Sequence, residues 1–533
     1  MPIAAKRMLF LTHRWLGIVL CAFFAMWFAS GVVMMYVGYP KLTEAERLAH
    51  LPPLDASVPL LAPAQALHLA GIDTPLLSLR LAIASGGQPV YLAVEGAHSD
   101  GHGVERARTA GTIAIDALTG ARLAQVDRSR ALASAAAYAR TAASGRPPGT
   151  AALPALHYLG TIDEDALTHT RSLDPHRPLH RVQLDDEDHT LLYVSGLTGE
   201  VVRDAPRVER LWNYAGAWIH WLYPLRGNVF DRYWADIVNA LSIAGIAVAL
   251  TGTVVGLLRW RFGRPYRDGS RSPYPSALMK WHHVAGLLFA AATLTWIFSG
   301  LMSMNPWRLF SSDAPALRTA ALHGGPLRFD GSEAHPAALL QAAGPGAREL
   351  RWVRNLGALS VQVRSAAGRP ALLDGHTALA RTLPIDALRG AAAGLMPDKL
   401  LRIDVLHDYD LYYYDRAPHT MTGGGDKPLP VWRLVFADRD RIWVHLDPHT
   451  GAVLDRLDKR RRTSRWLFSM LHSWDWLPLL QRRPLWDLLL LTLAAGGAVM
   501  SITGVVIGWR RLRRQRRQAR QGRQRRRGSA PIQ

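Results

Sequence analysis

The sequence has one cysteine, Cys21, among 533 residues, and this scarcity excludes several kinds of site. A lone cysteine forms no intrachain disulfide, no Cys-x-x-Cys-His run for covalent haem, and no cysteine-based zinc or iron–sulfur centre. The sequence also lacks a Gly-x-Gly-x-x-Gly run between a strand and a helix, so no Rossmann-type dinucleotide site is expected. Histidine, with 21 copies, is the metal-ligand type that remains.

Acidic residues are scarce relative to basic ones. The chain has 63 Lys and Arg against 42 Asp and Glu, a formal net charge of +21. Much of this excess comes from the C-terminal run RRLRRQRRQARQGRQRRR. A basic run can indicate nucleic-acid binding, but one that starts at the end of an apolar segment is explained more simply by membrane topology and anionic lipid. We therefore expect contact with the lipid bilayer and no nucleic-acid partner.

Four long apolar segments predict transmembrane helices. Each is long enough to cross about 30 Å of hydrocarbon at about 1.5 Å per residue. The first follows Lys6 and Arg7 as a signal peptide would, but its apolar run is too long and no small-residue cleavage pattern follows, so it is expected to be uncleaved. The segments are residues 9–37, 233–258, 278–304 and 485–509.

Basic residues near the ends of these segments predict their orientation. The connection between the second and third segments, RWRFGRPYRDGSRSPYPSALMK, has six basic residues and one acidic residue, Asp268. Together with the basic C-terminal run, it places this loop and both chain termini on the cytoplasmic side. The two long polar regions are then expected outside the cytoplasm.

The apolar segments form two matched pairs, which indicates an internal duplication. The stretch THRWLGIVLCAFFAMWFASGVV aligns without gaps with WHHVAGLLFAAATLTWIFSGLM, so that His13 matches His282 and Ser30 matches Ser299. The stretches around the second and fourth segments align in the same way, so that His220 matches His472. Most aliphatic positions differ between the copies, whereas His, Trp and Gly are retained.

Two glycines lie near His13 on the face of its predicted helix. Gly31 is about five whole turns away, and Gly17 is about 40° around the helix. Glycine in a membrane helix usually marks close packing of another helix. It also leaves room for a flat macrocycle, which a histidine on the same face would suit.

The predicted topology sorts the four matched histidines into two pairs. His13 and His282 lie at the cytoplasmic ends of the first and third segments, while His220 and His472 precede the second and fourth on stretches expected to lie along the opposite surface. Two imidazoles that face each other across a pseudo-twofold axis suit the axial positions of a haem b. Two such haems, one near each surface, would divide electron transfer across the membrane into shorter steps.

Other interpretations of these histidines stay open. Zinc or copper could use a histidine pair, but two ligands without a carboxylate or thiolate leave such sites incomplete. Proton-relay histidines usually lie in mid-membrane, whereas these lie near the surfaces. A histidine at a helix end can also serve as a structural anchor at the headgroups. His283 adjoins His282 but points about 100° away, and it is a reserve ligand.

The two polar regions predict small α+β domains. Apolar alternation typical of strands is interrupted by a recurring turn that ends in Thr-Gly, in which the hydroxyl braces the turn and glycine accepts a positive φ. Helical stretches such as APAQALHLAG and HPAALLQAAG precede the strands. The turns lie at Asp116–Gly120, Ser195–Gly199 and Asp447–Gly451, with a degenerate copy near Asp374.

These stretches together resemble the PepSY-associated transmembrane family, whose members are often called iron-regulated membrane proteins. The resemblance rests on the Thr-Gly strands, the opening LTHRWLGI, the stretch DYDLYYYDRAP with the strands that follow it, and the closing TGVVIGWRR. It covers nearly the whole chain. It implies a membrane α-helical fold, with four transmembrane helices as two tandem repeats and two extracytoplasmic α+β PepSY-like domains.

Some members of that family are bacterial inner-membrane siderophore reductases with haem between the helices and PepSY domains in the periplasm. The resemblance therefore implies a di-haem b oxidoreductase that passes electrons from the cytoplasmic side to a periplasmic ferric siderophore and releases iron(II). Residue by residue, it implies axial ligands of the haem iron at His13, His282, His220 and His472. Some relatives carry a fused flavin and nicotinamide module. This sequence lacks one, so an unidentified reductase, a reduced flavin or the quinol pool is the expected electron donor.

Two other functions stay open. The PepSY-like domains could bind or regulate periplasmic proteins, or assist a transporter, with the helices as anchors and no redox chemistry. The haems could also serve another acceptor, such as copper(II) or a periplasmic protein. Tyr412–Tyr414 and Asp410 are expected to form a surface packed toward the membrane, or part of a substrate cleft. His407 and His419 are expected to be solvated loop residues, or contacts of a ferric complex.

The expected division of the chain follows from these predictions. The cytoplasmic parts are residues 1–8, 259–277 and 510–533, the periplasmic domains are residues 38–205 and 305–463, and the periplasmic interfacial helices are residues 206–232 and 464–484.

Overall fold

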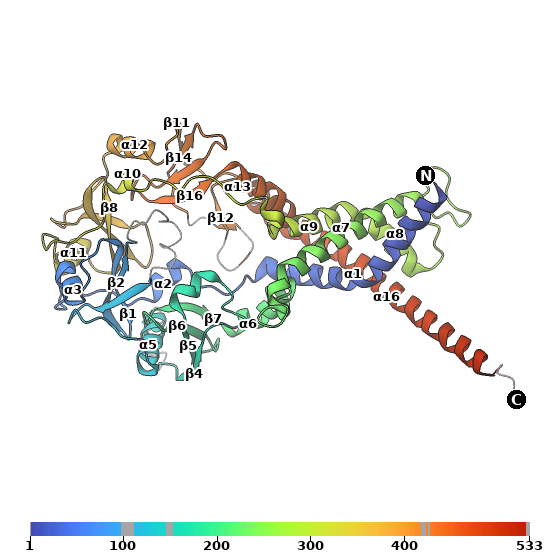
Figure 1. Cartoon of the computed structure of the whole chain (residues 1–533), viewed down its shortest axis with the longest axis horizontal. Helices are drawn as coiled ribbons and strands as arrows, with labels where there is room; N and C mark the ends of the chain where they lie inside the picture. The colour runs from blue at the N-terminus through green and yellow to red at the C-terminus, as the bar shows by residue number, and fades with distance from the viewer. Residues whose placement is uncertain are drawn as a thin grey trace.

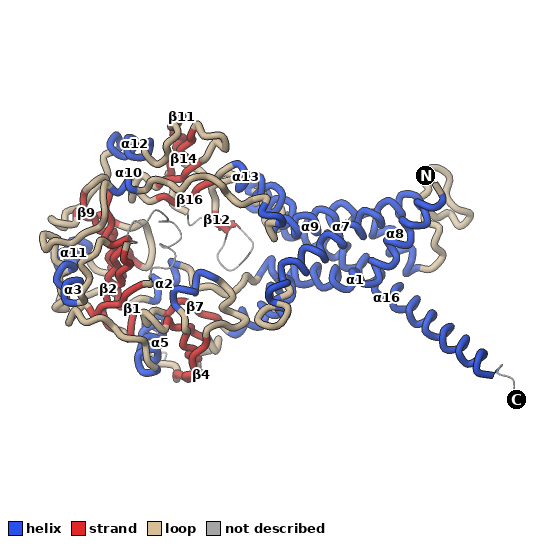
Figure 2. The backbone as a smooth tube through the Cα atoms, viewed as in Figure 1, coloured by secondary structure: helices blue, strands red, loops and turns tan. Residues whose placement is uncertain are grey.

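The computed structural model describes residues 2–96, 111–144, 153–416, 420, 423–424 and 427–528. Its long helices run side by side as a bundle at one end of the molecule (Figure 1). Figure 2 shows the strands confined to the other end. The N-terminus lies at the end of the bundle that is farthest from the strands (Figure 1).

Among the described residues, three helices are long and apolar enough to cross a membrane, or four if one bent pair forms a single span. α1 packs against α7 and α16, while α8 packs against α16 and α9 packs against α7. The first, second and fourth predicted segments are thus confirmed as helices, and the third is the bent pair. The helices are α1 (Ile3–Tyr36), α7 (Trp234–Arg259), the pair α8 (Ala277–Leu288) and α9 (Ala290–Ser303), and α16 (Leu485–Gly528).

The bend between α8 and α9 is 66° and falls at Phe289. Its ring fills the space in which a Cβ of Gly496 on α16 would lie. No proline marks this break, although proline is the usual cause of a sharp kink. The sequence alone therefore predicted one transmembrane helix over residues 278–304, without this break. α16 also continues without interruption into the basic run, which begins as an extension of the membrane helix.

The largest sheet is built from both polar regions of the chain. It has six strands in the order β10-β9-β8-β1-β2-β3, and β1 pairs with β8 in antiparallel register with Leu81 opposite Leu350. The expected division into residues 38–205 and 305–463 put β1 and β8 in separate domains, whereas the structure joins them. Such a pairing links residues far apart in the chain, so local patterns do not reveal it. The strands are β1 (Leu76–Ser85), β2 (Gln88–Glu95), β3 (Thr112–Asp116), β8 (Ala347–Asn355), β9 (Ala358–Ser365) and β10 (Ala371–Asp374).

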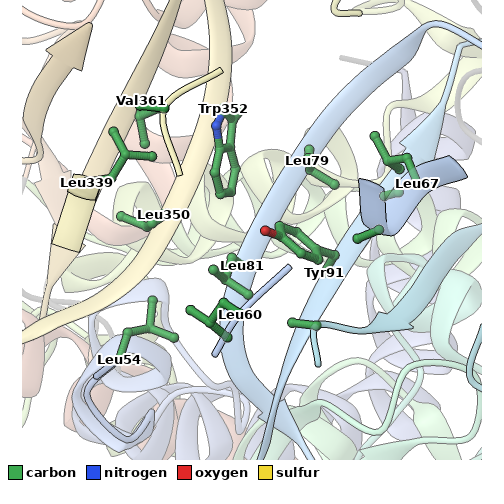
Figure 3. Packing of buried hydrophobic residues seen from close by; sticks show 14 of the residues in the cluster. Leu54, Leu60, Leu67, Leu79, Leu81, Tyr91, Leu339, Leu350, Trp352 and Val361 are labelled. Carbon is green, nitrogen blue, oxygen red and sulfur yellow. The ribbon is translucent and has the colours of Figure 1, made fainter. Parts of the chain in front are cut away.

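One face of this sheet carries the main core of the strand-rich end. Alternate residues of β1 and β8 point to this face, among them Leu79, Leu81 and Trp352, and all three are fully buried. Figure 3 shows them packed with Tyr91 of β2. Helices α3 (Pro63–Leu69) and α11 (Pro336–Ala343) cover this face. Each such buried side chain stabilises the fold by about 1.5–3 kcal/mol, so this core holds the two polar regions together.

Each polar region also has a four-stranded sheet with one helix against it. In the first region α5 (Arg128–Ser144) packs on β4-β5-β6-β7, and in the second α12 (Ile385–Ala393) packs on β11-β14-β15-β16. The strands are β4 (Leu156–Ile162), β5 (Leu179–Leu184), β6 (Leu191–Ser195), β7 (Val201–Ala205), β11 (Leu400–Leu406), β14 (Val431–Phe436), β15 (Trp443–Leu446) and β16 (Val453–Leu457).

The recurring Thr-Gly turns lie where the sequence placed them. Two connect adjacent strands, β6 to β7 and β15 to β16, and the other two follow β3 and β10. Gly199 and Gly451 have φ of 75° and 71°, which only glycine adopts without strain. In the degenerate copy Ala378 takes this place, with φ of 58°. The prediction of hairpin turns is confirmed between these two pairs of strands.

Short elements connect the larger ones. The α-helices are α2 (Glu44–His50), α6 (Arg207–Asn213), α10 (Ala320–His323), α13 (Lys459–Ser464), α14 (Leu471–Ser473) and α15 (Leu477–Leu480). The strands β12 (Asp415–Arg416) and β13 (Gly423–Gly424) form a small pair. The 3₁₀ turns are η1 (Arg171–His176), η3 (Tyr223–Leu225), η4 (Asp231–Tyr233) and η5 (Pro306–Arg308), and the π-helical turns are η2 (Tyr214–Trp218) and η6 (Arg465–Met470).

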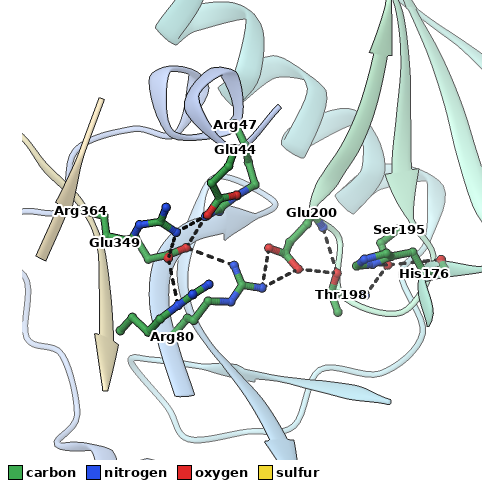
Figure 4. Close-up of polar contacts among 10 residues, drawn as sticks. Glu44, Arg47, Arg80, His176, Ser195, Thr198, Glu200, Glu349 and Arg364 are labelled. Atoms are coloured by element: carbon green, nitrogen blue, oxygen red, sulfur yellow. Dashed lines mark hydrogen bonds and ion pairs between the residues drawn. The ribbon is translucent and has the colours of Figure 1, made fainter. Parts of the chain in front are cut away.

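A buried cluster of ion pairs joins the six-stranded sheet to the first four-stranded sheet (Figure 4). The carboxylate of Glu349 on β8 is fully buried and lies 2.6 Å from Arg47 of α2 and 3.1 Å from Arg80 of β1. Arg80 also lies 3.2 Å from Glu200, just after the turn of β6. Arg364 completes the cluster, 3.3 Å from Glu349. Buried charges are costly unless paired, so these contacts specify how the two sheets meet.

Acid is expected to weaken this cluster. Burial alone raises the pKa of Glu349, but Arg47 and Arg80 outweigh it and hold the pKa below its ordinary 4.5. The pKa of Glu200 is lowered in the same way, by Arg80 and Arg47 against burial. A carboxylate with a lowered pKa contributes its full stabilisation above the unfolded pKa and loses it as the pH falls through the folded pKa.

We therefore expect the unfolding temperature of the purified protein to drop steeply below pH of about 4.5. Scanning fluorimetry in detergent from pH 7 to pH 3 measures this. The Glu349→Gln variant should unfold at lower temperature at pH 7 and show a shallower decline, because one of the titrating carboxylates of the cluster is gone. Equal slopes for the two proteins would contradict the assignment.

Candidate functional site

His13 and His282 face each other at the end of the bundle away from the strands. Their ring centres are 6.4 Å apart and their planes differ by 35°. The Nδ1 of His13 lies 3.3 Å from the carbonyl oxygen of Val248 on α7, and the Nδ1 of His282 lies 2.9 Å from that of Met500 on α16. A carbonyl only accepts, so each Nδ1 carries the proton and donates it. Each Nε2 is then left with a free lone pair, the form that binds metals.

Small residues make room around this pair. A Cβ at Gly252 would lie 2.6 Å from Cε1 of His13, and one at Gly504 would lie 3.2 Å from Cε1 of His282. Both histidines line a cavity of about 790 Å³, as do Gly17 and Gly286. A Cβ at Gly17 would meet no atom within 4 Å. Gly17 therefore borders open space rather than a tightly packed helix, while Gly252 is a close helix contact.

His220 and His472 form the second pair, where the bundle meets the strand-rich end. Their ring centres are 6.1 Å apart and their planes differ by 78°. The Nδ1 of His220 lies 3.0 Å from Oγ of Ser30, and the Nδ1 of His472 lies 3.0 Å from Oγ of Ser299.

These two serines settle the proton positions of the second pair. Ser30 donates its hydroxyl to the carbonyl of Met26, and Ser299 donates to that of Trp296. Each hydroxyl oxygen therefore accepts a hydrogen bond from the histidine Nδ1–H. Among the described residues, the Nε2 atoms of all four histidines make no hydrogen bond. The sequence alignment had matched Ser30 with Ser299 without giving either a role, and that match was the available signal.

Local backbone irregularity positions the second pair. A π-helical turn precedes each histidine, η2 before His220 and η6 before His472. Such π-bulges are rare and frequently occur at functional sites. Tryptophans then fix the following backbone: Nε1 of Trp27 donates to the carbonyl of His220, and Nε1 of Trp486 donates to that of Ser473. The sequence predicted interfacial helices here but not their π-turns.

The two pairs lie at different levels of the bundle. Ser30 and His13 are both on α1, and the distance between them along a helix of this rise is about 25 Å. Phe24, Trp27 and Phe28 of α1 lie between those levels, and Phe28 packs against Trp296 of α9 with ring centres 5.7 Å apart. The pairs thus sit near opposite ends of the helical bundle, with an apolar core between them.

Unlike its neighbour His282, His283 has no free Nε2. It is buried, with Nε2 2.9 Å from the carbonyl oxygen of Gly256 and Nδ1 2.8 Å from Oγ of Ser272. Both ring nitrogens are therefore engaged, Nε2 as donor and Nδ1 as acceptor from the serine. This histidine ties the loop before α8 to the end of α7. His282, and not His283, faces His13.

The stretch Tyr412–Tyr414 packs against the segment that carries His472. Tyr414 lies in an apolar cluster with Met35, Trp486 and residues of α15. Its hydroxyl accepts from Arg465 at 3.0 Å, and Tyr412 accepts from Nε1 of Trp466 at 2.8 Å. Asp410 instead pairs with Arg433 at 2.7 Å.

An ion cluster that the sequence did not reveal lies beside His472. Asp475 is buried and lies 2.7 Å from Arg416 on β12 and 3.0 Å from Arg465. Arg416 also donates to Oγ of Ser473, the residue after His472, at 2.8 Å. The cluster ties the second polar region to the segment of His472. His407 is exposed, and His419 lies outside the described residues.

No three His, Cys, Asp or Glu side chains come together as a metal site in the described part of the chain. What the four histidines offer is two imidazoles at a time, with ring centres 6.4 Å apart in one pair and 6.1 Å apart in the other. This arrangement suits a group that brings its own equatorial ligands and needs only axial ones.

The fold and the two histidine pairs define a membrane protein with a strand-rich region at one end of a helical bundle. The family profile described as PepSY-associated TM region matches residues 10–421. The chain belongs to this family, as the sequence motifs predicted. No curated protein matches the chain.

The two glycine environments predict different responses to an added methyl group. Gly252→Ala should lower the free energy of unfolding by about 1–3 kcal/mol, because the Cβ would collide with His13. Gly17→Ala should change it by less than about 0.5 kcal/mol, because its Cβ enters open space. Both are measured by reversible unfolding in mixed micelles. Equal losses in the two variants would mean that His13 does not hold the position described.

Proposed function

We propose that this protein binds two haem b groups, one between His13 and His282 and one between His220 and His472, and reduces ferric siderophores. The ring separations carry the haem-binding part of this proposal. A metal–imidazole bond of about 2 Å, with the ring centre roughly 1 Å beyond the nitrogen, puts two axial imidazoles about 6 Å apart. The measured separations are 6.4 and 6.1 Å.

The proton positions and the available space support the same proposal. Within the residues that the structure describes, all four Nε2 lone pairs are free, because each Nδ1–H is held by a carbonyl or serine oxygen, the usual outer-shell support of a ligating histidine. The 790 Å³ cavity beside the first pair lies within the range of cofactor pockets. When bound, haem supplies an iron that accepts and donates one electron at a time.

We also propose that the chain has four spans arranged as two tandem repeats, with α8 and α9 as one bent span. Support comes from contacts that recur at matched positions. The His13 contact with Val248 corresponds to the His282 contact with Met500, and the Ser30 contact with His220 corresponds to the Ser299 contact with His472.

The basic loop and tail lie at the bundle end that holds His13, and they favour a cytoplasmic position for this end and for both termini. The strand-rich end would then lie in the periplasm of a bacterium, outside its inner membrane. His220 and His472 would lie on the periplasmic side, nearest the strand-rich end.

Within this proposal the residues have distinct tasks. The first pair would hold the group that takes electrons from a cytoplasmic reductase, a reduced flavin or quinol, and the second pair would hold the group that passes them outward. One electron converts iron(III) in the siderophore to iron(II), which its hard anionic oxygens hold less tightly. Tyr412 and Tyr414, beside the His472 segment, place the second polar region next to this exit.

The histidine assignment predicts separable losses of bound haem. Purified wild-type protein should show b-type absorbance on dithionite reduction and about two haems per chain in a pyridine haemochrome assay. His13→Ala and His472→Ala should each lose about one haem, because a single imidazole holds the group less firmly. His407→Ala, at an exposed histidine, should lose none. A colourless wild type from haem-replete cells would instead favour a PepSY anchor without redox chemistry.

The acceptor assignment predicts iron release. Anaerobic, dithionite-reduced protein freed of excess reductant should be reoxidised by ferric siderophores and yield trapped iron(II) in proportion to the electrons it holds. His472→Ala should slow this reaction at least about tenfold, because the outer electron carrier is lost. Matched rates with reduced free haem, or reoxidation by copper(II) alone, would rule out the siderophore as the acceptor.

A further inference from the structure

The cavity beside His13 and His282 has an uncompensated positive lining. Five arginines border it: Arg14, Arg259, Arg510, Arg511 and Arg514. They come from three helices, α1, α7 and α16. No Asp or Glu is among the lining residues, and none of the five arginines forms an ion pair with a carboxylate in the described part of the chain. Arg259 instead lies over the ring of Phe10, 4.9 Å from its centre.

Such a concentration of cations is unfavourable without an anion. Guanidinium groups that share one cavity repel each other, and the low-dielectric wall of a helical bundle screens them less than bulk water does. An anionic ligand would relieve this repulsion. Arginine is also the residue whose planar donors fit carboxylate oxygens best.

The position of the arginines relative to the histidines narrows the choice of anion. His13 and His282 line the same cavity and are partly buried, while the arginines of α16 lie beyond Trp509, where the helix leaves the apolar segment. Arg510, Arg511 and Arg514 are exposed. A ligand that reaches both groups would meet the imidazoles at one end and would have its anionic groups at the solvent end.

We propose that these arginines bind the two propionate carboxylates of the porphyrin held by His13 and His282. This inference rests on the proposed function and adds a role for the start of the basic run, which the sequence analysis explained by membrane topology and anionic lipid. The carboxylates would stay at the solvent-exposed opening of the cavity, where the free-energy cost of their desolvation is small. The later arginines of the run remain free for anionic lipid.

The test compares iron protoporphyrin IX with its dimethyl ester, which has the same ring and iron but no carboxylate charge. Apoprotein in neutral-lipid nanodiscs is titrated with each. The first site is identified as the fraction lost in His13→Ala. The triple variant Arg510→Gln, Arg511→Gln, Arg514→Gln removes three lining charges. Its matched control, Arg516→Gln, Arg517→Gln, Arg520→Gln, removes three charges from the same helix outside the cavity.

Wild type and control should bind the acid about tenfold more tightly than the ester at this site, and the lining variant should bind both about equally. The wild-type ratio needs no variant and stands even if the triple variant folds poorly, and Arg511→Lys should keep most of the preference. Equal binding of acid and ester by wild type, or an equal loss of preference in the control, overturns the inference while leaving the haem site intact.

Two other outcomes are also decisive. A preference for the acid that disappears in nanodiscs containing phosphatidylglycerol assigns the arginines to lipid headgroups and overturns the inference. Binding of neither compound to wild type overturns the proposed function itself.

Discussion

The four hydrogen bonds from histidine Nδ1 atoms are the constraint on which the rest of the structure depends. Each bond joins two different helices or segments. His13 of α1 donates to Val248 of α7, and His282 of α8 donates to Met500 of α16. His220 and His472 donate to serines of α1 and α9. The imidazoles are therefore oriented only when the bundle is assembled, so folding of the bundle and formation of the site are one event.

These four hydrogen bonds lie inside the helical bundle, where a hydrogen bond is stronger than in water. In the low-dielectric interior of a helical bundle, a hydrogen bond is electrostatically stronger than in water, and an unpaired polar group costs correspondingly more. The serines each satisfy their own proton on a carbonyl of the preceding turn and so present an oxygen that only accepts. The serine hydrogen bond thus fixes the position of each imidazole, its tautomer and the direction in which its free Nε2 points. The same logic, with backbone carbonyls in place of hydroxyls, applies at the other end of the bundle.

Patterns within single segments predicted much of this structure. Features that depend on contacts between distant segments were mostly not predicted. Segment length and hydropathy predicted the helices, Thr-Gly spacing predicted hairpin turns, and alignment of the copies singled out the four histidines that the structure brings together in pairs. The pairing of β1 with β8, the break at Phe289 and the Asp475 ion cluster depend on partners far away in sequence. The sequence has no signal for the carbonyls of Val248 and Met500 that accept these hydrogen bonds, because every residue has a backbone carbonyl.

The most direct test of the central claim is electron paramagnetic resonance of the oxidised protein at low temperature. The ring planes differ by 35° in one pair and 78° in the other. Two bis-imidazole ferric haems held at these angles should give two distinct low-spin signals, and the more anisotropic one should come from the near-perpendicular pair and vanish in His472→Ala. Absence of low-spin haem signals from a haem-replete preparation, or a single high-spin signal, would contradict the account.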